Sequence, residues 1–190
     1  INLVRQMILT NSDKERGSII ERLLPIQKED FIDLFKEMSN LPVTIRLLDP
    51  PLHEFLPNSQ QEIQRTANLM AITEQQLADR IKDLSEFIPR LGTRGVRLGV
   101  MVPEIYDMQV QAIFLAAIEV FKKYKIVVNP EIMIPLISAN KEVDLVRDRI
   151  KEVFSQLNKN NFVDLKYKLG VMVETPRAAL RAVSYTHLRA

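Results

Sequence analysis

The sequence predicts an α/β protein with parallel strands. Short β-rich apolar segments alternate along the chain with longer segments of helical periodicity. After Pro42 the order is strand, helices, strand, helix, strand, and consecutive parallel strands need helical crossovers of this kind. The chain has 190 residues, 46% hydrophobic and 26% charged, which suits one folded domain.

Two helices are expected ahead of the first strand. The first runs from residue 11 or 12 to about Leu24, where Pro25 should end it because proline lacks an amide donor. The second covers about Glu29–Met38. The segment LPVTIRLLD then predicts a buried strand at Val43–Leu47.

A stiff polar loop follows this strand. The prolines at 50–51 cannot lie inside a helix or a central strand. Beyond them, residues 59–71 predict a polar helix, and Thr73 with Gln76 forms a capping box for another helix that ends near Phe87.

The second half of the chain predicts two further strands. Residues 88–99, IPRLGTRGVRLG, form an irregular cationic loop that holds three of the five glycines. A long, well-buried helix is expected at about 104–124, a strand at about 131–134 and a helix at about 141–157. The segment KYKLGVMVE predicts a last strand that ends at Glu174, before a helix that starts in TPRAAL.

Composition excludes several classes of function. A net charge of +2 offers no case for a nucleic acid or membrane partner, and the lack of cysteine rules out disulfides and thiolate metal sites. No apolar run approaches the roughly 20 residues of a membrane span, so we expect a soluble, cytoplasmic protein. Because the chain does not start with Met, we interpret it as a piece of a longer one.

Charged residues at two strand ends are the first candidates for a site. Arg46 and Glu174 each follow an apolar strand, and parallel neighbours would bring both to the carboxyl edge where α/β enzymes build their sites. The alternative is that the two simply pair or lie in solvated loops. Arg94 and Arg97 in the glycine loop could clamp an anion, or could belong to a solvated turn.

Other polar residues carry weaker signals. His53 could act as a general acid or base, but a lone histidine between Leu52 and Glu54 is more often structural. Glu131 is unusual because it lies inside an apolar strand segment. The chain has no Walker loop, GxGxxG or GxSxG motif, so these nucleotide and acyl-transfer signatures are absent.

Four segments together identify a family. PVTIRLLDPPLHEF, LGTRGVRLGVMVPEI, PEIMIPLI and GVMVETPRAAL resemble the C-terminal, phosphoenolpyruvate-binding barrel of the pyruvate, phosphate dikinase family, and the resemblance extends from about Val4 to Ala182. It implies part of a (β/α)8 TIM barrel with extra helices. Other phosphoenolpyruvate-utilising enzymes share the arginines and the glutamate, whereas the DPPLHEF continuation is typical of the dikinases.

The resemblance also implies roles for three residues. Arg46 would be catalytic and bind the phosphoryl group of phosphoenolpyruvate, and Arg94 would be a second catalytic, substrate-binding arginine. Glu174 would bind the cofactor Mg²⁺ and, with it, the substrate. The reaction would convert ATP, phosphate and pyruvate to AMP, pyrophosphate and phosphoenolpyruvate through a phosphohistidine on another domain, so His53 is not that histidine.

Several family features are missing from these 190 residues. The resemblance implies a second magnesium ligand, an aspartate, and a general-acid cysteine beyond this segment, as well as nucleotide-binding and phosphohistidine domains and a homodimer. We therefore expect residues 1–183 to form a partial barrel domain that is inactive alone, and residues 184–190, SYTHLRA, to be a non-native tail. A noncatalytic α/β anion-binding or regulatory module is the alternative, and a structural scaffold is a third.

Overall fold

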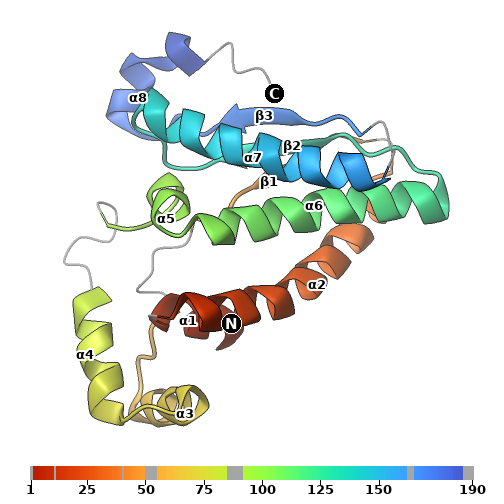
Figure 1. Cartoon of the computed structure of the whole chain (residues 1–190). Coiled ribbons are helices and arrows are strands. Elements are labelled where there is room, and N and C mark those ends of the chain that lie inside the picture. The colour runs from red at the N-terminus through yellow and green to blue at the C-terminus, as the bar shows by residue number, and fades with distance from the viewer. Residues whose placement is uncertain are drawn as a thin grey trace. The chain divides into compact units, whose positions relative to one another are not determined.

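The computed structural model describes residues 2–10, 12–39, 41–49, 55–84, 92–161 and 165–185. The chain divides into two compact units. Unit 1 consists of residues 1–23 and 50–94, and unit 2 consists of residues 24–49 and 95–190. The elements of both are labelled in Figure 1.

Unit 1 is helical in its described part. It contains α1 (Asn2–Leu9), the first part of α2 (Asp13–Glu37), α3 (Gln60–Met70) and α4 (Glu74–Leu84). Helix α1 was not predicted from the sequence. A small apolar core joins α1, α3 and α4 through Leu9, Leu56, Ala67 and Leu77, with Ile63, Met70, Ile72 and Ile81 packed against it.

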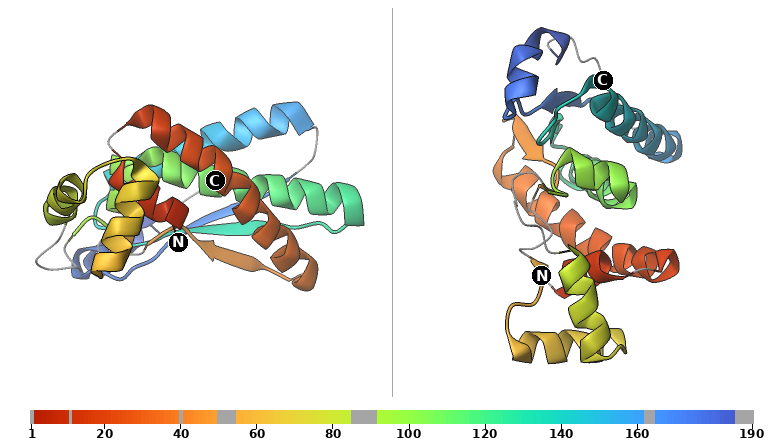
Figure 2. Two further views of the ribbon diagram at one scale, coloured as in Figure 1. Left: turned by 90° about the horizontal axis from the view of Figure 1, so that it is seen from below. Right: turned by 90° about the vertical axis from the view of Figure 1, so that its left-hand side faces the viewer.

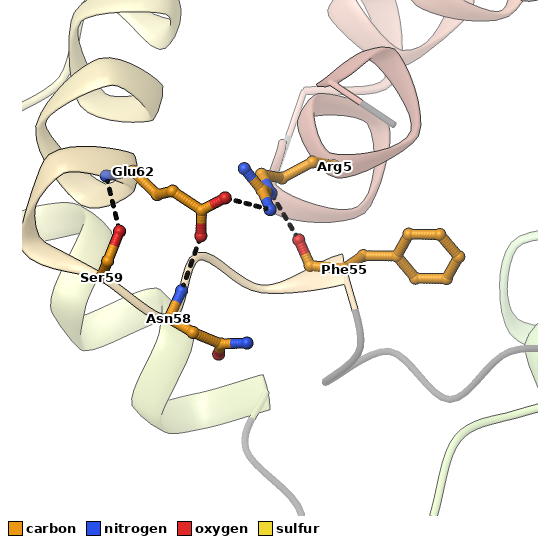
Figure 3. Close-up of polar contacts among 5 residues, drawn as sticks. All are labelled: Arg5, Phe55, Asn58, Ser59 and Glu62. Atoms are coloured by element: carbon orange, nitrogen blue, oxygen red, sulfur yellow. Dashed lines mark hydrogen bonds and ion pairs between the residues drawn. The ribbon is translucent and has the colours of Figure 1, made fainter.

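A buried arginine ties α1 to the start of α3, as Figure 3 shows. The Arg5 side chain donates from Nε to the Phe55 carbonyl at 2.6 Å and pairs with Glu62 at 3.4 Å. Glu62 also accepts the Asn58 amide at 3.0 Å, and its own amide donates to the Ser59 hydroxyl at 3.2 Å. The Asn58 amide and then the Arg5 charge lower the pKa of the Glu62 carboxyl, so this cluster favours the ionised acid.

The predicted helix starts in unit 1 are confirmed. Ser59 caps α3, and Ala71 ends it in the left-handed region with φ 52°. Thr73 and Gln76 form the reciprocal capping box ahead of α4, with both hydrogen bonds at 3.1 Å. Local sequence therefore fixes this helical pair.

In the described part of unit 2, three strands form one parallel sheet. They are β1 (Val43–Arg46), β2 (Pro130–Ile134) and β3 (Lys168–Val171), in the order β1-β2-β3. The predicted parallel α/β arrangement is confirmed. Arg46 lies opposite Met133 in β2, and Met133 lies opposite Gly170 in β3.

Helices cover one face of this sheet. In Figures 1 and 2, α6 (Pro103–Tyr124) and α7 (Asn140–Asn161) lie side by side along it. The other helices described in this unit are shorter. They are α5 (Val96–Met101), α8 (Pro176–Leu180), the 3-10 helix η2 (Ala182–Tyr185) and the last part of α2.

Aromatic packing joins the two long helices to the sheet. Phe114 of α6 is fully buried, and its ring centroid lies 5.2 Å from Phe154 of α7 and 5.1 Å from Tyr167 ahead of β3. Burial of a phenylalanine stabilises a fold by roughly 1.5–3 kcal/mol. The prediction that the centre of α6 is buried is confirmed.

Three local predictions are wrong. Helix α2 continues through Pro25 and does not break there; the lost hydrogen bond is offset because the helix buries Ile19 and Leu23 before the proline and Phe35 after it. The last four residues of the glycine loop are helical, since α5 begins at Val96. β3 ends at Val171, so Glu174 lies in the following loop.

We expect Glu119 to make the stability of unit 2 depend on pH. Its carboxylate pairs with Lys123 at 2.6 Å and with Lys28 of α2, and these bonds, Lys123 first, lower its pKa to about 2 from 4.5. A lowered pKa means that the contribution is complete above pH 4.5 and is lost as pH falls toward 2. We expect Glu119→Gln to flatten the fall of the urea midpoint across this window. Parallel curves for parent and variant would contradict the assignment.

Candidate functional site

The carboxyl edge of the sheet in unit 2 holds two of the predicted residues. Arg46 is the last residue of β1. Glu174 follows β3, which is the other outer strand of the described sheet. Parallel strands place such residues at one edge, with the loop after β2 between them.

Arg46 is held by a buried acid that the sequence analysis did not select. Its guanidinium Nη1 lies 3.4 Å from Oδ2 of Asp49, which is 2% exposed, whereas the Arg46 side chain is 49% exposed. Guanidinium offers five donors in a planar fork. The pair with Asp49 therefore anchors one part of the arginine and leaves donors directed to solvent, which is the geometry needed to bind an anion.

Helix α6 fixes the loop that carries this pair. The Leu48 amide donates to Oε1 of Gln109 at 2.8 Å, and the Tyr106 hydroxyl donates to the Leu48 carbonyl at 3.0 Å. Both α6 side chains are buried. Burial, and then the negative charge of Asp49, raises the pKa of Tyr106, so its hydroxyl stays protonated and keeps donating.

Glu174 is oriented by the loop after β2. Its Oε1 accepts the Leu136 amide at 2.8 Å. The next residue, Thr175, donates its hydroxyl to the Ile137 carbonyl at 2.9 Å and caps α8 by accepting the Ala178 amide. In the described part of the chain, Oε2 of Glu174 has no hydrogen-bond partner, so one exposed carboxylate oxygen remains available.

This carboxylate suits one ligand position of a hard cation. Mg²⁺ takes oxygen ligands and usually keeps several waters beside one or two carboxylates. Among the described residues, no group of three or more acidic or histidine side chains could hold a metal. Glu174 therefore fits as a single ligand, and the remaining oxygens would come from water, substrate or other residues.

A polar row crosses the sheet face on which Arg46 lies. Thr44, Glu131 and Lys168 are register partners across the three described strands. Glu131 accepts the Thr44 hydroxyl at 2.7 Å and pairs with Lys168 at 2.9 Å. These bonds, Lys168 first, lower the pKa of Glu131. Glu131, the acid that was unusual in the sequence, thus has its negative charge balanced by Lys168 within the sheet, one row away from Arg46.

The other sequence candidates have different placements. Arg94 is the last residue of unit 1 and is half-buried, and the chain passes from it directly to Gly95 of unit 2. Arg97 lies in α5 and is also half-buried. His53 lies outside the described residues. Within them, Arg46 and Glu174 contact Asp49 and Leu136 and not each other, so the alternative in which they pair is wrong.

The sequence as a whole matches a known family. Residues 1–187 match the family model described as PEP-utilising enzyme, PEP-binding domain. The chain belongs to this family.

Within this family, the chain is similar to curated proteins named pyruvate, phosphate dikinase. The chain is 46% identical over 182 residues to pyruvate, phosphate dikinase of Rhizobium meliloti (strain 1021), covering 96% of the chain and 20% of that protein. It is 43% identical over 179 residues to the enzyme of Clostridium symbiosum, covering 94% of the chain and 20% of the relative. It is 45% identical over 184 residues to pyruvate, phosphate dikinase 2 of Oryza sativa subsp. japonica, covering 96% of the chain and 21% of the relative. The chain spans about a fifth of the length of these relatives.

Two observations bear on the predicted absence of a membrane span and on the predicted non-native tail. In the part of the chain that the structure describes, no helix has the length and apolar character needed to cross a membrane. The family match runs through residue 187, and Tyr185 of η2 is buried, while residues 186–190 lie outside the described ranges. A non-native tail at 184–190 stays a prediction.

Proposed function

We propose that this chain is the phosphoenolpyruvate-binding part of a phosphotransferase that interconverts pyruvate and phosphoenolpyruvate, as a pyruvate, phosphate dikinase does. The overall reaction would turn ATP, phosphate and pyruvate into AMP, pyrophosphate and phosphoenolpyruvate, with a phosphohistidine on another domain as carrier. The observation that carries the proposal is the half-exposed Arg46 held on buried Asp49 at the carboxyl edge of a parallel sheet, in a chain of this family.

Arg46 would bind the phosphoryl group. Guanidinium matches phosphate oxygens bidentately, and a fixed cation stabilises charge that develops during phosphoryl transfer. The pair with Asp49 supports this role because it limits the positions that the guanidinium can take. Arg94 would be a second cationic contact to the substrate.

Glu174 would bind the catalytic cation. When bound, Mg²⁺ would polarise the substrate oxygens and stabilise enolate charge. Glu174 supports this with one oxygen fixed by the Leu136 amide and the other without a partner in the described residues. Because one amide already holds Oε1, a ligand at Oε2 would need no rearrangement of the loop.

The wider assembly is part of the same proposal. The three described strands would belong to a (β/α)8 barrel, and the polar row of Thr44, Glu131 and Lys168 would be one layer of its interior. The nucleotide-binding and phosphohistidine domains, a homodimer and a cytoplasmic location remain predictions.

The test is label exchange in the complete protein that contains this chain. Incubated with phosphoenolpyruvate, radiolabelled pyruvate and Mg²⁺ but no nucleotide, it should move label into phosphoenolpyruvate, and chelation of the metal should stop the exchange. An anion-binding module would bind phosphoenolpyruvate in calorimetry without exchange. A scaffold would do neither, and either result would reject the proposal.

A further inference from the structure

Two glycines of the cationic loop pack against the groups that hold Arg46 and Glu174. The sequence suggested that glycines here let backbone amides approach an anion. In the structure, Gly95 and Gly99 are buried and make close contacts inside unit 2 instead.

Gly95 lies between the loop after β1 and the loop after β2. Its φ of 54° with ψ of −134° is a backbone conformation that side chains rarely permit. A Cβ there would lie 2.7 Å from Cβ of Leu136, 2.9 Å from Oδ1 of Asp49 and 3.2 Å from the Pro135 carbonyl. Asp49 holds Arg46, and the Leu136 amide holds Glu174. One missing methyl group thus lets both loops take their positions.

The hydrogen bond beside Gly95 fixes the same approach. The Val96 amide donates to the Pro135 carbonyl at 3.1 Å. Leu136 itself lies in the left-handed region, with a φ of 53°. A side chain at Gly95 would therefore push on Asp49 and on Leu136 together.

The atoms nearest to Gly99 belong to the group of residues that holds Arg46. A Cβ at this α5 position would lie 2.2 Å from the ring of Tyr106, which is 2% exposed. The Tyr106 hydroxyl donates to the Leu48 carbonyl in the loop that carries Asp49. Displacement of the ring would break this bond and release the loop, with no contact in this set that leads to Glu174.

We propose that Gly95 and Gly99 are positioning residues: the absence of a side chain at both sets the Arg46 guanidinium, and its absence at Gly95 also sets the Glu174 carboxylate. The proposal rests on the proposed function, in which Arg46 binds the phosphoryl group and Glu174 binds the cation. It makes the GTRGVRLG segment a support for the site, whatever its arginines bind.

The experiment compares Gly95→Ala and Gly99→Ala with the control Gly17→Ala, where an added Cβ meets nothing within 4 Å. Since a misplacement of about 1 Å can cost on the order of 100-fold in rate, we expect kcat/KM for phosphoenolpyruvate to fall about 10-fold or more in both loop variants. Affinity for Mn²⁺, read by electron paramagnetic resonance as a probe of the cation site, should fall in Gly95→Ala alone. Gly17→Ala should match the parent.

A double-mutant cycle with Tyr106 distinguishes a positioning role of Gly99 from a general loss of packing. In a Tyr106→Ala background neither the ring nor a δ carbon remains to meet a Cβ at Gly99, so adding Gly99→Ala should change kcat/KM little, whereas it lowers kcat/KM strongly when Tyr106 is present. Equal effects in the two backgrounds would overturn the proposal. This cycle tests the role of Gly99 even if Gly95→Ala does not fold.

Crystal structures of parent and Gly99→Ala read the positions without reference to activity. Movement of the Arg46 guanidinium with Glu174 unmoved supports the proposal, even in a protein that exchanges no label and so fails the proposed function. Unmoved Arg46, or a lower melting temperature with unchanged KM and kcat in an active protein, rejects it.

Discussion

Replacement of Arg46 by Lys should abolish most of the activity of the complete protein while leaving it folded. Lysine keeps the positive charge but cannot contact Asp49 and a phosphoryl group together with a planar fork. Loss of one preorganised donor to developing charge costs on the order of 100- to 1,000-fold in turnover. We expect a fall of this size in the rate of label exchange between pyruvate and phosphoenolpyruvate.

Arg149→Lys is a matched control for this substitution. Arg149 of α7, like Arg46, pairs with a carboxylate, here that of Asp107 in α6, and the hydrogen bond to Asp107 raises the pKa of the Arg149 guanidinium. This pair lies on partly exposed helix surface, so the control should alter stability slightly and the exchange rate little. Near-parental exchange in a folded Arg46→Lys protein would remove Arg46 from the site.

The strands and the long helices could be predicted because their signals are local. β1 and β2 follow from short β-rich apolar runs, and α6 from an apolar segment too long for a strand. Continuation of α2 through Pro25 could not, because the cost of about 3 kcal/mol for an internal proline is offset by packing that only the folded chain reveals. The helix α5 was hidden for the same reason, since its start depends on the contact of Val96 with Pro135.

The site could be predicted only in part. Arg46 and Glu174 were selected as candidates because a charge at the end of an apolar strand has no packing reason to be there. The role of Asp49 was not found, although it follows Arg46 by only three positions, because its burial depends on Gly95 and α6. Sequence pattern marks which side chains reach the edge of a sheet, whereas long-range contacts decide how they are aimed.

Glu174→Gln should separate the shape of this site from its charge. The amide oxygen of glutamine can still accept the Leu136 amide, so the loop after β2 should keep its conformation. The outward atom then becomes an NH₂ group, which cannot ligate a cation. Loss of a residue that only supports a metal ligand already costs about 10- to 100-fold in metal affinity or activity. We therefore expect loss of the ligand itself to raise the Mg²⁺ concentration needed for half-maximal exchange by at least about 100-fold.

Glu142→Gln supplies the comparison. Glu142 also accepts backbone amides beside the end of β2, from Ser138 and Ala139 at 2.9 Å, but it does so at the start of α7. It should lose some thermal stability and keep the Mg²⁺ activation curve of the parent. Mn²⁺ titration followed by electron paramagnetic resonance should show weaker binding in Glu174→Gln and parental binding in Glu142→Gln. If both variants keep the activation curve and the Mn²⁺ affinity, Glu174 only supports the loop after β2, and the cation must bind elsewhere.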